Sequence, residues 1–391
     1  MSEFYDVVIS GCGPSGSLLG YLLSQSNIKT LIIEKENFPR QKICAGGIQH
    51  RTLSLIPFKI DDIIEKTIFG IYFSLKNKDI FFRRNDNPIL YTVNRARFDS
   101  MLAQQAGKEG CIIKFGEKVE SFTCSSSYVE IKTSRKKYRT KVLVGADGIR
   151  GTVHRNLLGR KKINKILAYE TELSYKDKGN DKGNDIIEDN KGNVFNFCNS
   201  VRLDFNGVKR GYCWVFPKKN FLSCGMGAPF HDVLNMKKYF KNFLTDFYLD
   251  GKYKNIGPKI YAHGIPLKDE DTPICNFRVL AVGDAACLGD GFTGEGLFNS
   301  IKSSCIASEC IIHSLRNSNF YFKDYEERIK NDIYRDIKIS FLLTKIFYSS
   351  LLLIYKLLLK NDNYFYACCK ILRGEKSYKD VVDKLKILKL R

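Results

Sequence analysis

The sequence predicts an α/β protein with an N-terminal strand–turn–helix–strand unit, a β-rich middle and a helical C-terminal region. Three observations predict this order. An apolar run over residues 6–10 enters a glycine-rich turn that is followed by a helical pattern. Alternating β-type runs dominate residues 166–228, and residues 320–391 are hydrophobic and helical in pattern. With 391 residues, the chain is long enough for two or more domains.

The glycine-rich turn predicts a Rossmann-like dinucleotide-binding unit. Gly11, Gly13 and Gly16 have the spacing G-x-G-x-x-G. The first permits a tight turn, the second lets the backbone approach a pyrophosphate, and the third lets the following helix pack against the strand. A second strand, residues 30–33, ends in Glu34, at the distance where an acid holds the ribose hydroxyls of an adenosine.

Composition narrows the classes of partner. The net charge is +21 and the pI is near 9.3, but there is no compact basic stripe with interleaved aromatics of the kind that tracks a nucleic acid. An anionic membrane surface or a phosphorylated ligand fits better, and compositional bias alone is the simplest account. The thirteen cysteines lack paired or zinc-type spacing, which predicts free thiols in a reducing cytoplasm and no metal site. The N-terminus opens directly into a strand, so no signal peptide is expected.

The remaining elements follow in order along the chain. A helix is expected over residues 95–106. Strands are expected at residues 68–75, 80–82, 90–93, 111–115, 117–122, 128–133, 138–144, 166–175, 194–205, 211–216, 221–228 and 277–286. The polar stretch 176–192, with a direct repeat over residues 177–184, predicts an exposed mobile loop. The longest uncharged run of the tail, residues 346–355, is shorter than the ~20 residues of a membrane-spanning helix, which predicts an interfacial or core-packing helix.

Two further motifs indicate that the dinucleotide is a flavin. One is Val-Gly-Ala-Asp-Gly at residues 144–148, and the other is Val-Gly-Asp at 282–284 with a glycine loop behind it. Asp284, at a strand end, suits the hydroxyls of a ribitol chain. Backbone N–H groups of residues 294–297, at a helix N-terminus, suit the N1–C2=O edge of an isoalloxazine ring. The order of the three motifs predicts FAD.

Taken together, these motifs resemble the flavin-dependent hydroxylase superfamily and, within it, the geranylgeranyl reductase family, over nearly the whole chain. Four local matches favour the reductase branch. They are Lys-Ile-Cys-Ala-Gly-Gly at residues 42–47, Tyr-Cys-Trp-Val-Phe-Pro-Lys at 212–218, the loop 288–296, and Gly-Glu-Lys-Ser-Tyr at 374–378. The second, a Y-x-W-x-F-P motif, is the most specific, because it contains the only Trp in the chain.

The resemblance implies a set of flavin contacts. Beside the glycines of the turn, they are Ser15, Glu34, Cys44, Ala45, Gly47, Arg95, Val119, Asp284, Gly296 and Leu297. The family's adjacent basic pair is interrupted by Ala96, so Arg95 and Arg97 both remain candidates. Cys44 is the candidate proton donor because its loop lies at the ring, although a buried neutral thiol is the simpler interpretation. The histidines have no catalytic context in the sequence: His50, His154, His231, His263 and His313.

The resemblance also implies a reaction, the reduction of isolated C=C bonds of a prenyl chain by hydride from reduced flavin. Tyr212, Trp214 and Phe216 fall on one face of a strand, where they line either a lipid groove or an ordinary sheet core. The expected substrate is a prenylated lipid or prenyl diphosphate, and the donor is NAD(P)H or a ferredoxin-like protein. A flavin monooxygenase acting on an aromatic substrate and a non-catalytic membrane-associated flavoprotein remain as alternatives.

The predicted organisation has three parts. Residues 1–65, 94–165 and 270–318 form a discontinuous FAD-binding domain, residues 66–93 and 166–269 form an inserted antiparallel β-sheet substrate domain, and residues 319–391 form a helical region. Leucines of that region are edged by lysines: Leu351, Leu352, Leu353, Leu357 and Leu358 beside Lys345, Lys356 and Lys360. This arrangement predicts a cytoplasmic protein with peripheral contact to a membrane.

Overall fold

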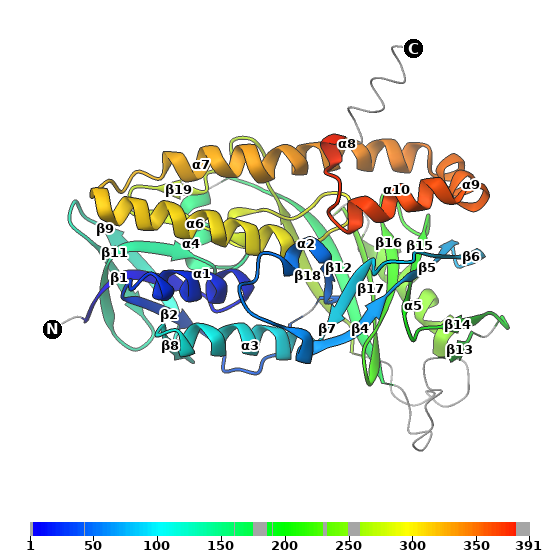
Figure 1. The fold of residues 1–391 in the computed structure, drawn as a ribbon, viewed down its shortest axis with the longest axis horizontal. Coiled ribbons are helices and arrows are strands. Elements are labelled where there is room, and N and C mark those ends of the chain that lie inside the picture. The colour runs from blue at the N-terminus through cyan, green and yellow to red at the C-terminus, as the bar shows by residue number, and fades with distance from the viewer. Residues whose placement is uncertain are drawn as a thin grey trace, which may run out of the picture.

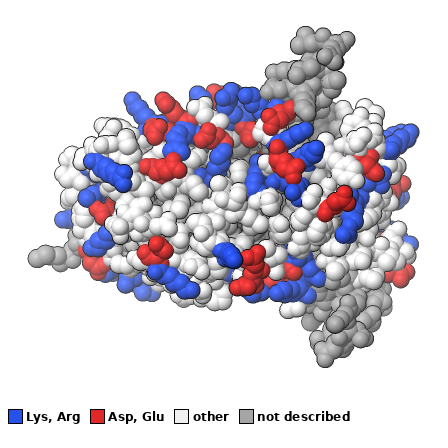
Figure 2. Space-filling view, in the orientation of Figure 1, with Lys and Arg blue, Asp and Glu red and all other residues white. Residues whose placement is uncertain are grey.

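The computed structural model describes residues 3–42, 44–159, 161–174, 186–189, 191–229, 233–248 and 259–380. Two large β-sheets lie at opposite ends of an elongated molecule, and helices cover them along one side (Figure 1). Figure 2 shows Lys and Arg interspersed with Asp and Glu over the face in view, rather than gathered into a patch of one sign. On that face, the basic excess is spread out.

The first sheet has eight strands and a parallel centre. Its order is β19-β20-β11-β1-β2-β8, with β10 and β9 added through β11. The strands are β1 (Glu3–Ser10), β2 (Thr30–Glu34), β8 (Ile112–Phe115), β9 (Val119–Cys124), β10 (Val129–Thr133), β11 (Lys137–Gly145), β19 (Cys275–Asn276) and β20 (Val279–Ala281). Strand β1 runs parallel to β2 and β11, so the carboxyl ends of these strands open at one edge of the sheet. Ligands of open α/β sheets bind at such an edge.

The second sheet has seven strands in the order β18-β12-β17-β16-β15-β5-β6. They are β5 (Gly70–Leu75), β6 (Lys78–Arg84), β12 (Asn164–Ser174), β15 (Ser200–Phe205), β16 (Tyr212–Pro217), β17 (Phe221–Pro229) and β18 (Tyr261–Leu267). All its pairings are antiparallel except β15 with β5. The fold is therefore the predicted α/β arrangement with an antiparallel sheet beside the parallel one.

Smaller sheets complete the β structure. A three-stranded sheet joins β3 (Gly47–Gln49), β7 (Leu90–Val93) and β4 (Ile64–Ile68), and draws on residues from both predicted domains. A hairpin pairs β13 (Ile186–Glu188) with β14 (Val194–Asn196). The repeat at residues 177–184 lies outside the described residues, but the prediction of a loop through residue 192 was wrong at β13, where Ile186 and Ile187 supply β-forming side chains. The predicted strand over 194–205 is divided between β14 and β15.

The helices lie mainly on one side of the two sheets. They are α1 (Pro14–Gln25), α2 (His50–Leu53), α3 (Arg95–Lys108), α4 (Thr152–Leu158), α5 (Val233–Tyr248), α6 (Leu297–Asn317), α7 (Lys323–Ile329), α8 (Arg335–Ser349), α9 (Leu351–Lys360) and α10 (Asp362–Leu372), with 3₁₀ turns at Asp61–Ile63 and Gly283–Ala286 and a π turn at Lys330–Tyr334. Helices α7 and α8 run the length of the molecule and deliver α9 and α10 to the end that carries the seven-stranded sheet (Figure 1).

The helical tail differs from the expected single helix over residues 346–355. The chain leaves the helical conformation at Ser350, whose φ is −117°, and α9 is bent by 85° from the rod that precedes it. Among the described residues, no single helix is long and apolar enough to cross a membrane; only α7–α8 together with α9 pass such a test, as a bent pair. The bend lets α9 and α10 pack against β5 and β15 in one apolar cluster.

Candidate active site

A cavity of about 1070 Å³ lies between the two sheets and the C-terminal helices. Every residue predicted to bind flavin or substrate lines this cavity except Gly16, which lies beneath the turn. One end is formed by the glycine turn of β1 and α1 and the start of α6, and is polar. The other end is formed by the seven-stranded sheet and helices α8–α10, and is apolar. The loop with Cys44 lies between them.

The turn after β1 leaves room for a phosphate by excluding side chains. Gly11 has φ +103°, and a Cβ there would lie 2.4 Å from the carbonyl oxygen of Ala146. At Gly16 a Cβ would lie 2.0 Å from the carbonyl oxygen of Gly11. Helix α1 begins at Pro14 with Gly13 as its N-cap and has no side-chain cap. Its first N–H groups therefore face the cavity without a side-chain acceptor, as a bound pyrophosphate requires.

Glu34 is held beside this turn at the end of β2. It is buried, its Oε2 accepts a hydrogen bond from the Cys12 amide at 2.7 Å, and its Oε1 accepts one from the Glu36 amide at 3.0 Å. Both bonds orient the carboxylate at the polar end of the cavity. Val119 borders the same end, and its carbonyl already accepts a hydrogen bond from Thr152 Oγ1 at 2.8 Å.

Arg95, rather than Arg97, faces the cavity. Its guanidinium binds Asp99 through two hydrogen bonds of 2.8 and 3.0 Å, and Arg40 reaches the same carboxylate at 3.2 Å. Arg97 instead pairs with Glu65 at 3.0 Å on the outer surface. Two guanidinium groups fixed by one buried carboxylate give this wall a positive charge, which suits a phosphate group.

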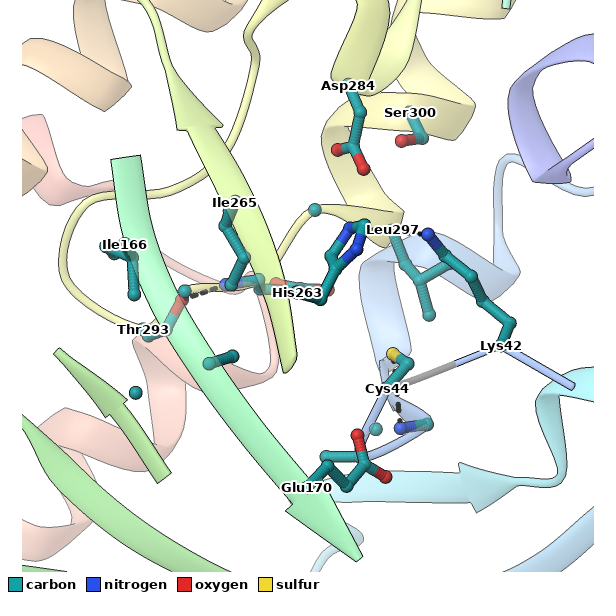
Figure 3. Close-up of a pocket in the computed structure, with 18 of the residues that line it drawn as sticks. Lys42, Cys44, Ile166, Glu170, His263, Ile265, Asp284, Thr293, Leu297 and Ser300 are labelled. Atoms are coloured by element: carbon teal, nitrogen blue, oxygen red, sulfur yellow. Dashed lines mark hydrogen bonds between the residues drawn. The ribbon is translucent and has the colours of Figure 1, made fainter. Parts of the chain in front are cut away.

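The third flavin motif places a second helix N-terminus at the cavity. The predicted strand over 277–286 is shorter than expected: β20 ends at Ala281 and Asp284 lies in the 3₁₀ turn that follows. Gly283 has φ +58°, and a Cβ there would lie 2.7 Å from Ser15 Oγ, so this turn contacts the first one. Helix α6 begins at Leu297 with Gly296 as an uncapped N-cap. Figure 3 shows Asp284 and Ser300 on the same side of the cavity, close to Leu297.

These features fit FAD. At Gly11, Gly16 and Gly283 a Cβ would lie within 2.7 Å of another atom, so the backbone of these turns packs too closely to admit a side chain. Glu34 would hold the ribose, the turn at Gly11–Gly16 the pyrophosphate, Asp284 the ribitol, and residues 294–297 the pyrimidine edge of the ring.

Lys218 joins the cysteine loop to the seven-stranded sheet. Its buried Nζ donates hydrogen bonds to the carbonyl oxygens of Ala45 and Val93, at 2.6 and 2.9 Å, and burial lowers the pKa of Lys218 to about 8. Phe216 packs where Gly47 has no side chain, 3.0 Å from the position of a Cβ. The loop at residues 42–47 and the motif at residues 212–218 are therefore in direct contact. Nothing in the sequence alone indicates a role for Lys218, although it directly follows Y-x-W-x-F-P.

His263, which has no catalytic context in the sequence, also borders the cavity. Its Nε2 lies 3.3 Å from Lys42 Nζ, and Asp284 is close to both (Figure 3). Burial, and then the charge of Lys42, lower the pKa of His263 to about 4, so its imidazole is neutral at pH 7. It lies on β18, a strand that contains Gly264 and Pro266 and has little β pattern. His154 is bound to the carbonyl of Ala285 at 2.8 Å, and His231 lies outside the described residues.

The Y-x-W-x-F-P triplet faces the cavity and not the sheet core. Tyr212, Trp214 and Phe216 line it, whereas the alternate residues Cys213 and Val215 pack against α5. The Tyr212 hydroxyl donates a hydrogen bond to the carbonyl of Thr293, in the loop before α6. The Trp214 indole covers Gly225, where a Cβ would lie 2.1 Å from the ring.

Beyond this triplet the cavity is walled by apolar side chains of β5, β15 and helices α8–α10. They are Phe73, Leu203, Phe205, Tyr348, Leu351, Tyr355, Leu358, Phe365 and Leu372. These residues come from three separate parts of the sequence. The site can thus hold a dinucleotide at one end and a long apolar chain at the other, and the two meet at the cysteine loop.

Comparison with known proteins agrees with this geometry. Residues 4–166 match a family model described as an FAD binding domain. The chain is 31% identical to an uncharacterized protein of Methanosarcina barkeri over 358 residues, 91% of this chain and 87% of that one. It is 28% identical to a digeranylgeranylglycerophospholipid reductase of Methanococcus vannielii over 367 residues, 88% of each chain.

The chain belongs to the geranylgeranyl reductase family of FAD-dependent oxidoreductases. Its fold matches a geranylgeranyl bacteriochlorophyll reductase-like protein from Thermoplasma acidophilum with a TM-score of 0.79, at 20% identity over 99% of this chain and 100% of that one. A flavin-dependent brominase matches with a TM-score of 0.73, at 18% identity over 98% and 99%. At these identities the two structures show a shared fold. Family membership makes this protein an FAD-binding enzyme, as the sequence predicts.

Proposed function

We propose that this protein reduces isolated C=C bonds of a prenyl chain of the geranylgeranyl type, with hydride supplied by reduced FAD. The observation that carries the proposal is the continuity of the cavity. Its polar end fits FAD, its apolar end is a channel walled by sheet and helices, and both meet at the loop with Cys44. The reductase names of the archaeal relatives support the same substrate class.

The position of each residue in the cavity indicates its role in this reaction. Bound FAD supplies the hydride. The clamp between Lys218 and the cysteine loop holds the loop against the sheet, and Trp214 and Phe216 orient the apolar chain beneath it. Helices α9 and α10 close the channel from water. Cys44 is at the junction, as the candidate proton donor expected from the sequence.

The experiment is an anaerobic single turnover. Protein with dithionite-reduced FAD is mixed with a geranylgeranylated glycerolipid, and the lipid is analysed by mass spectrometry. A gain of two hydrogen atoms per reduced bond supports the proposal. An unchanged lipid, with the flavin still reduced, rejects it. Repeating the reduction step with NAD(P)H or with a reduced ferredoxin-like protein identifies the electron donor.

A flavin monooxygenase is the second candidate, because the shared fold supports it. It predicts oxygen consumption with a hydroxylated aromatic product. The apolar channel favours a flexible aliphatic substrate, since its walls beyond Trp214 are mainly leucine and aromatic side chains that offer few polar groups to orient a phenol. A flavin that no physiological donor reduces would instead favour a non-catalytic flavoprotein.

We also propose peripheral contact with an anionic membrane through α9. One face of this helix borders the cavity through Leu351 and Leu358, and the opposite face exposes Leu352 and Leu353 at 60% and 62%. Three exposed lysines flank these leucines: Lys345 near the end of α8, and Lys356 and Lys360 in α9. Apolar side chains with a basic margin suit the interface of an anionic bilayer. A prenyl chain could then enter the channel without crossing water.

A further inference from the structure

Glu170 is a carboxyl group in the wall of the substrate channel. It lies on β12 opposite Gly225 of β17, and Gly225 lies opposite Trp214 of β16. Directly paired residues of an antiparallel sheet present their side chains on the same face, so Glu170 and Trp214 share the cavity side. Glu170 is only 5% exposed, and Figure 3 shows its carboxyl directed toward the loop with Cys44.

The two oxygens of the Glu170 carboxyl differ in their hydrogen bonding. Oε1 accepts a hydrogen bond from Ser223 Oγ at 2.7 Å. Oε2 is buried and has no hydrogen-bond partner within the described part of the chain, and the same holds for the nearby Trp214 Nε1. Buried polar atoms of native proteins nearly always have a partner. An unpartnered carboxyl oxygen and an unpartnered N–H on the wall of one channel therefore point to a ligand or water held between them.

The surroundings of Glu170 keep a proton on it. Burial raises its pKa to about 7, and the hydrogen bond from Ser223 and the charges of Lys218 and Arg95 act in the opposite direction. Other titratable groups lie on its side of the sheet: Glu172 on its own strand, Tyr261 across on β18 and Cys44 in the loop. Cys224 of β17 is paired with Val215 and lies on the opposite face, against α5. Near neutral pH a substantial fraction of the protein thus carries Glu170 as a neutral acid whose free oxygen faces the channel.

We propose that Glu170 is the catalytic acid of this site, which protonates the carbon of the C=C bond that does not receive the hydride. This inference rests on the proposed function. In the step, the O–H bond of Glu170 breaks and a C–H bond forms. The hydride forms the second C–H bond, the π bond is lost, and a carboxylate remains that solvent reprotonates. Atoms and charge balance with one hydride and one proton per bond reduced.

The other candidates at the junction are poorer acids. The Cys44 thiol is a weak hydrogen-bond donor, and its Sγ accepts a hydrogen bond from the Gly46 amide at 3.4 Å. The Tyr212 hydroxyl is already donated to the carbonyl of Thr293, and burial raises its pKa well above the usual value. His263 is neutral at pH 7 and carries no extra proton to transfer.

The test uses FAD-loaded protein in the anaerobic single turnover described above. Glu170→Gln keeps the size and the Ser223 contact of the side chain but removes the acidic proton. We expect its rate of prenyl reduction to fall by about 10²- to 10⁴-fold, the usual contribution of a general acid. Flavin absorbance and reduction by dithionite should stay unchanged. Glu327→Gln, at an exposed glutamate of α7 outside the cavity wall, is the matched control and should match the wild type.

The pH profile separates a chemical role from a structural one. With Glu170 as the acid, the wild-type rate falls as pH rises through about 7, because the carboxyl loses its proton. Ser223→Ala removes a hydrogen bond that favours the carboxylate, so this limb should move to higher pH. If Glu170 only packed against its neighbours, the rate would show no such pH limb, and Ser223→Ala would not shift it.

The outcomes are distinct. A wild-type protein that forms no reduced lipid overturns the proposed function, and the role of Glu170 with it. An active wild type with a Glu170→Gln variant within threefold of it overturns the role of Glu170 alone. So does a variant set in which Cys44→Ser, and not Glu170→Gln, loses product formation.

Discussion

The two ends of the cavity are built in different ways. At the nucleotide end, backbone turns do most of the work: Gly11, Gly16 and Gly283 let three turns approach, and two uncapped helices begin there. At the substrate end, the wall consists of side chains from several separate segments of the chain: β5, β15, β16 and α8–α10. The first end is therefore intolerant of a side chain added at any of these three glycines. The second should tolerate substitution and change its specificity before it loses its fold.

The largest effect should come from adding a side chain at the nucleotide end. Gly11→Val places atoms against the Ala146 carbonyl at a residue with φ +103°, and should abolish FAD retention. Gly107→Ala in α3 is the control, since nothing lies within 4 Å of its Cβ, and it should gain about 0.5–1 kcal/mol of stability. Flavin absorbance after gel filtration measures both. A yellow Gly11→Val protein would contradict the comparison.

Removing one polar contact from the same end should have a smaller effect. Asp284→Ala should raise the dissociation constant for FAD by about 10- to 150-fold, because a hydrogen bond to a charged acceptor is worth ~1.5–3 kcal/mol. Fluorescence titration of the apoprotein with FAD gives the value. Asp271→Ala, an exposed carboxylate outside the cavity wall, should leave it unchanged. Equal affinities for the two variants would mean that Asp284 does not contact the cofactor.

Two neighbours on β16 test the substrate end. Trp214→Ala should slow prenyl reduction by about tenfold or more, for a loss of at least ~1.4 kcal/mol of orientation, while the flavin spectrum persists. Val215→Ala faces α5 instead, and should lower unfolding stability by about 0.5–3 kcal/mol with little effect on turnover. Turnover and thermal unfolding are measured for both. If Trp214→Ala loses FAD or unfolds, this residue belongs to the core and not to a pocket.

The buried carboxyl of the substrate end predicts a pH dependence of stability. The pKa of Glu170 is raised from 4.5 to about 7 on folding, so the folded state binds more protons than the unfolded state between these values. Stability is therefore highest below pH 4.5 as far as this group is concerned, and falls by up to about 1.4 kcal/mol per pH unit toward pH 7. Urea unfolding from pH 5 to 8 should show a flatter profile for Glu170→Gln. Parallel profiles would indicate that the carboxyl is solvated.

The smallest effect should come from the outer face of α9. Replacing Leu352 and Leu353 by serine should weaken co-sedimentation with anionic liposomes several-fold while FAD stays bound, and high salt should weaken the wild type. Point variants are preferable to a truncation of the C-terminal region, because α9 and α10 also wall the channel. If the wild type fails to bind anionic vesicles at low salt, the membrane proposal is wrong.

The same contrast explains what the sequence could predict. A nucleotide-binding role could be predicted for Gly11, Glu34 and Asp284, because each lies in a short motif of neighbouring residues whose geometry is local. Tyr212, Trp214 and Phe216 followed from the period of one strand. The positions of Lys218, His263 and Glu170 at the cavity could not be predicted, since they depend on pairing between strands that are distant in the sequence. Nor did the pattern reveal α5, β18 or the break at Ser350, where neither proline nor glycine marks the end of a helix.

The position of the channel wall in the chain has a consequence for biosynthesis. The seven-stranded sheet is complete once β18 has been made, but its cover, which ends with α10, follows only about 100 residues later, roughly 5–20 s at ribosomal rates of about 5–20 residues per second. During that interval the nascent chain carries an uncovered apolar sheet face. A ribosome-associated chaperone has a defined window in which to protect it. A chain that ended after α6 would contain every strand of the eight-stranded sheet and would expose this apolar face to solvent.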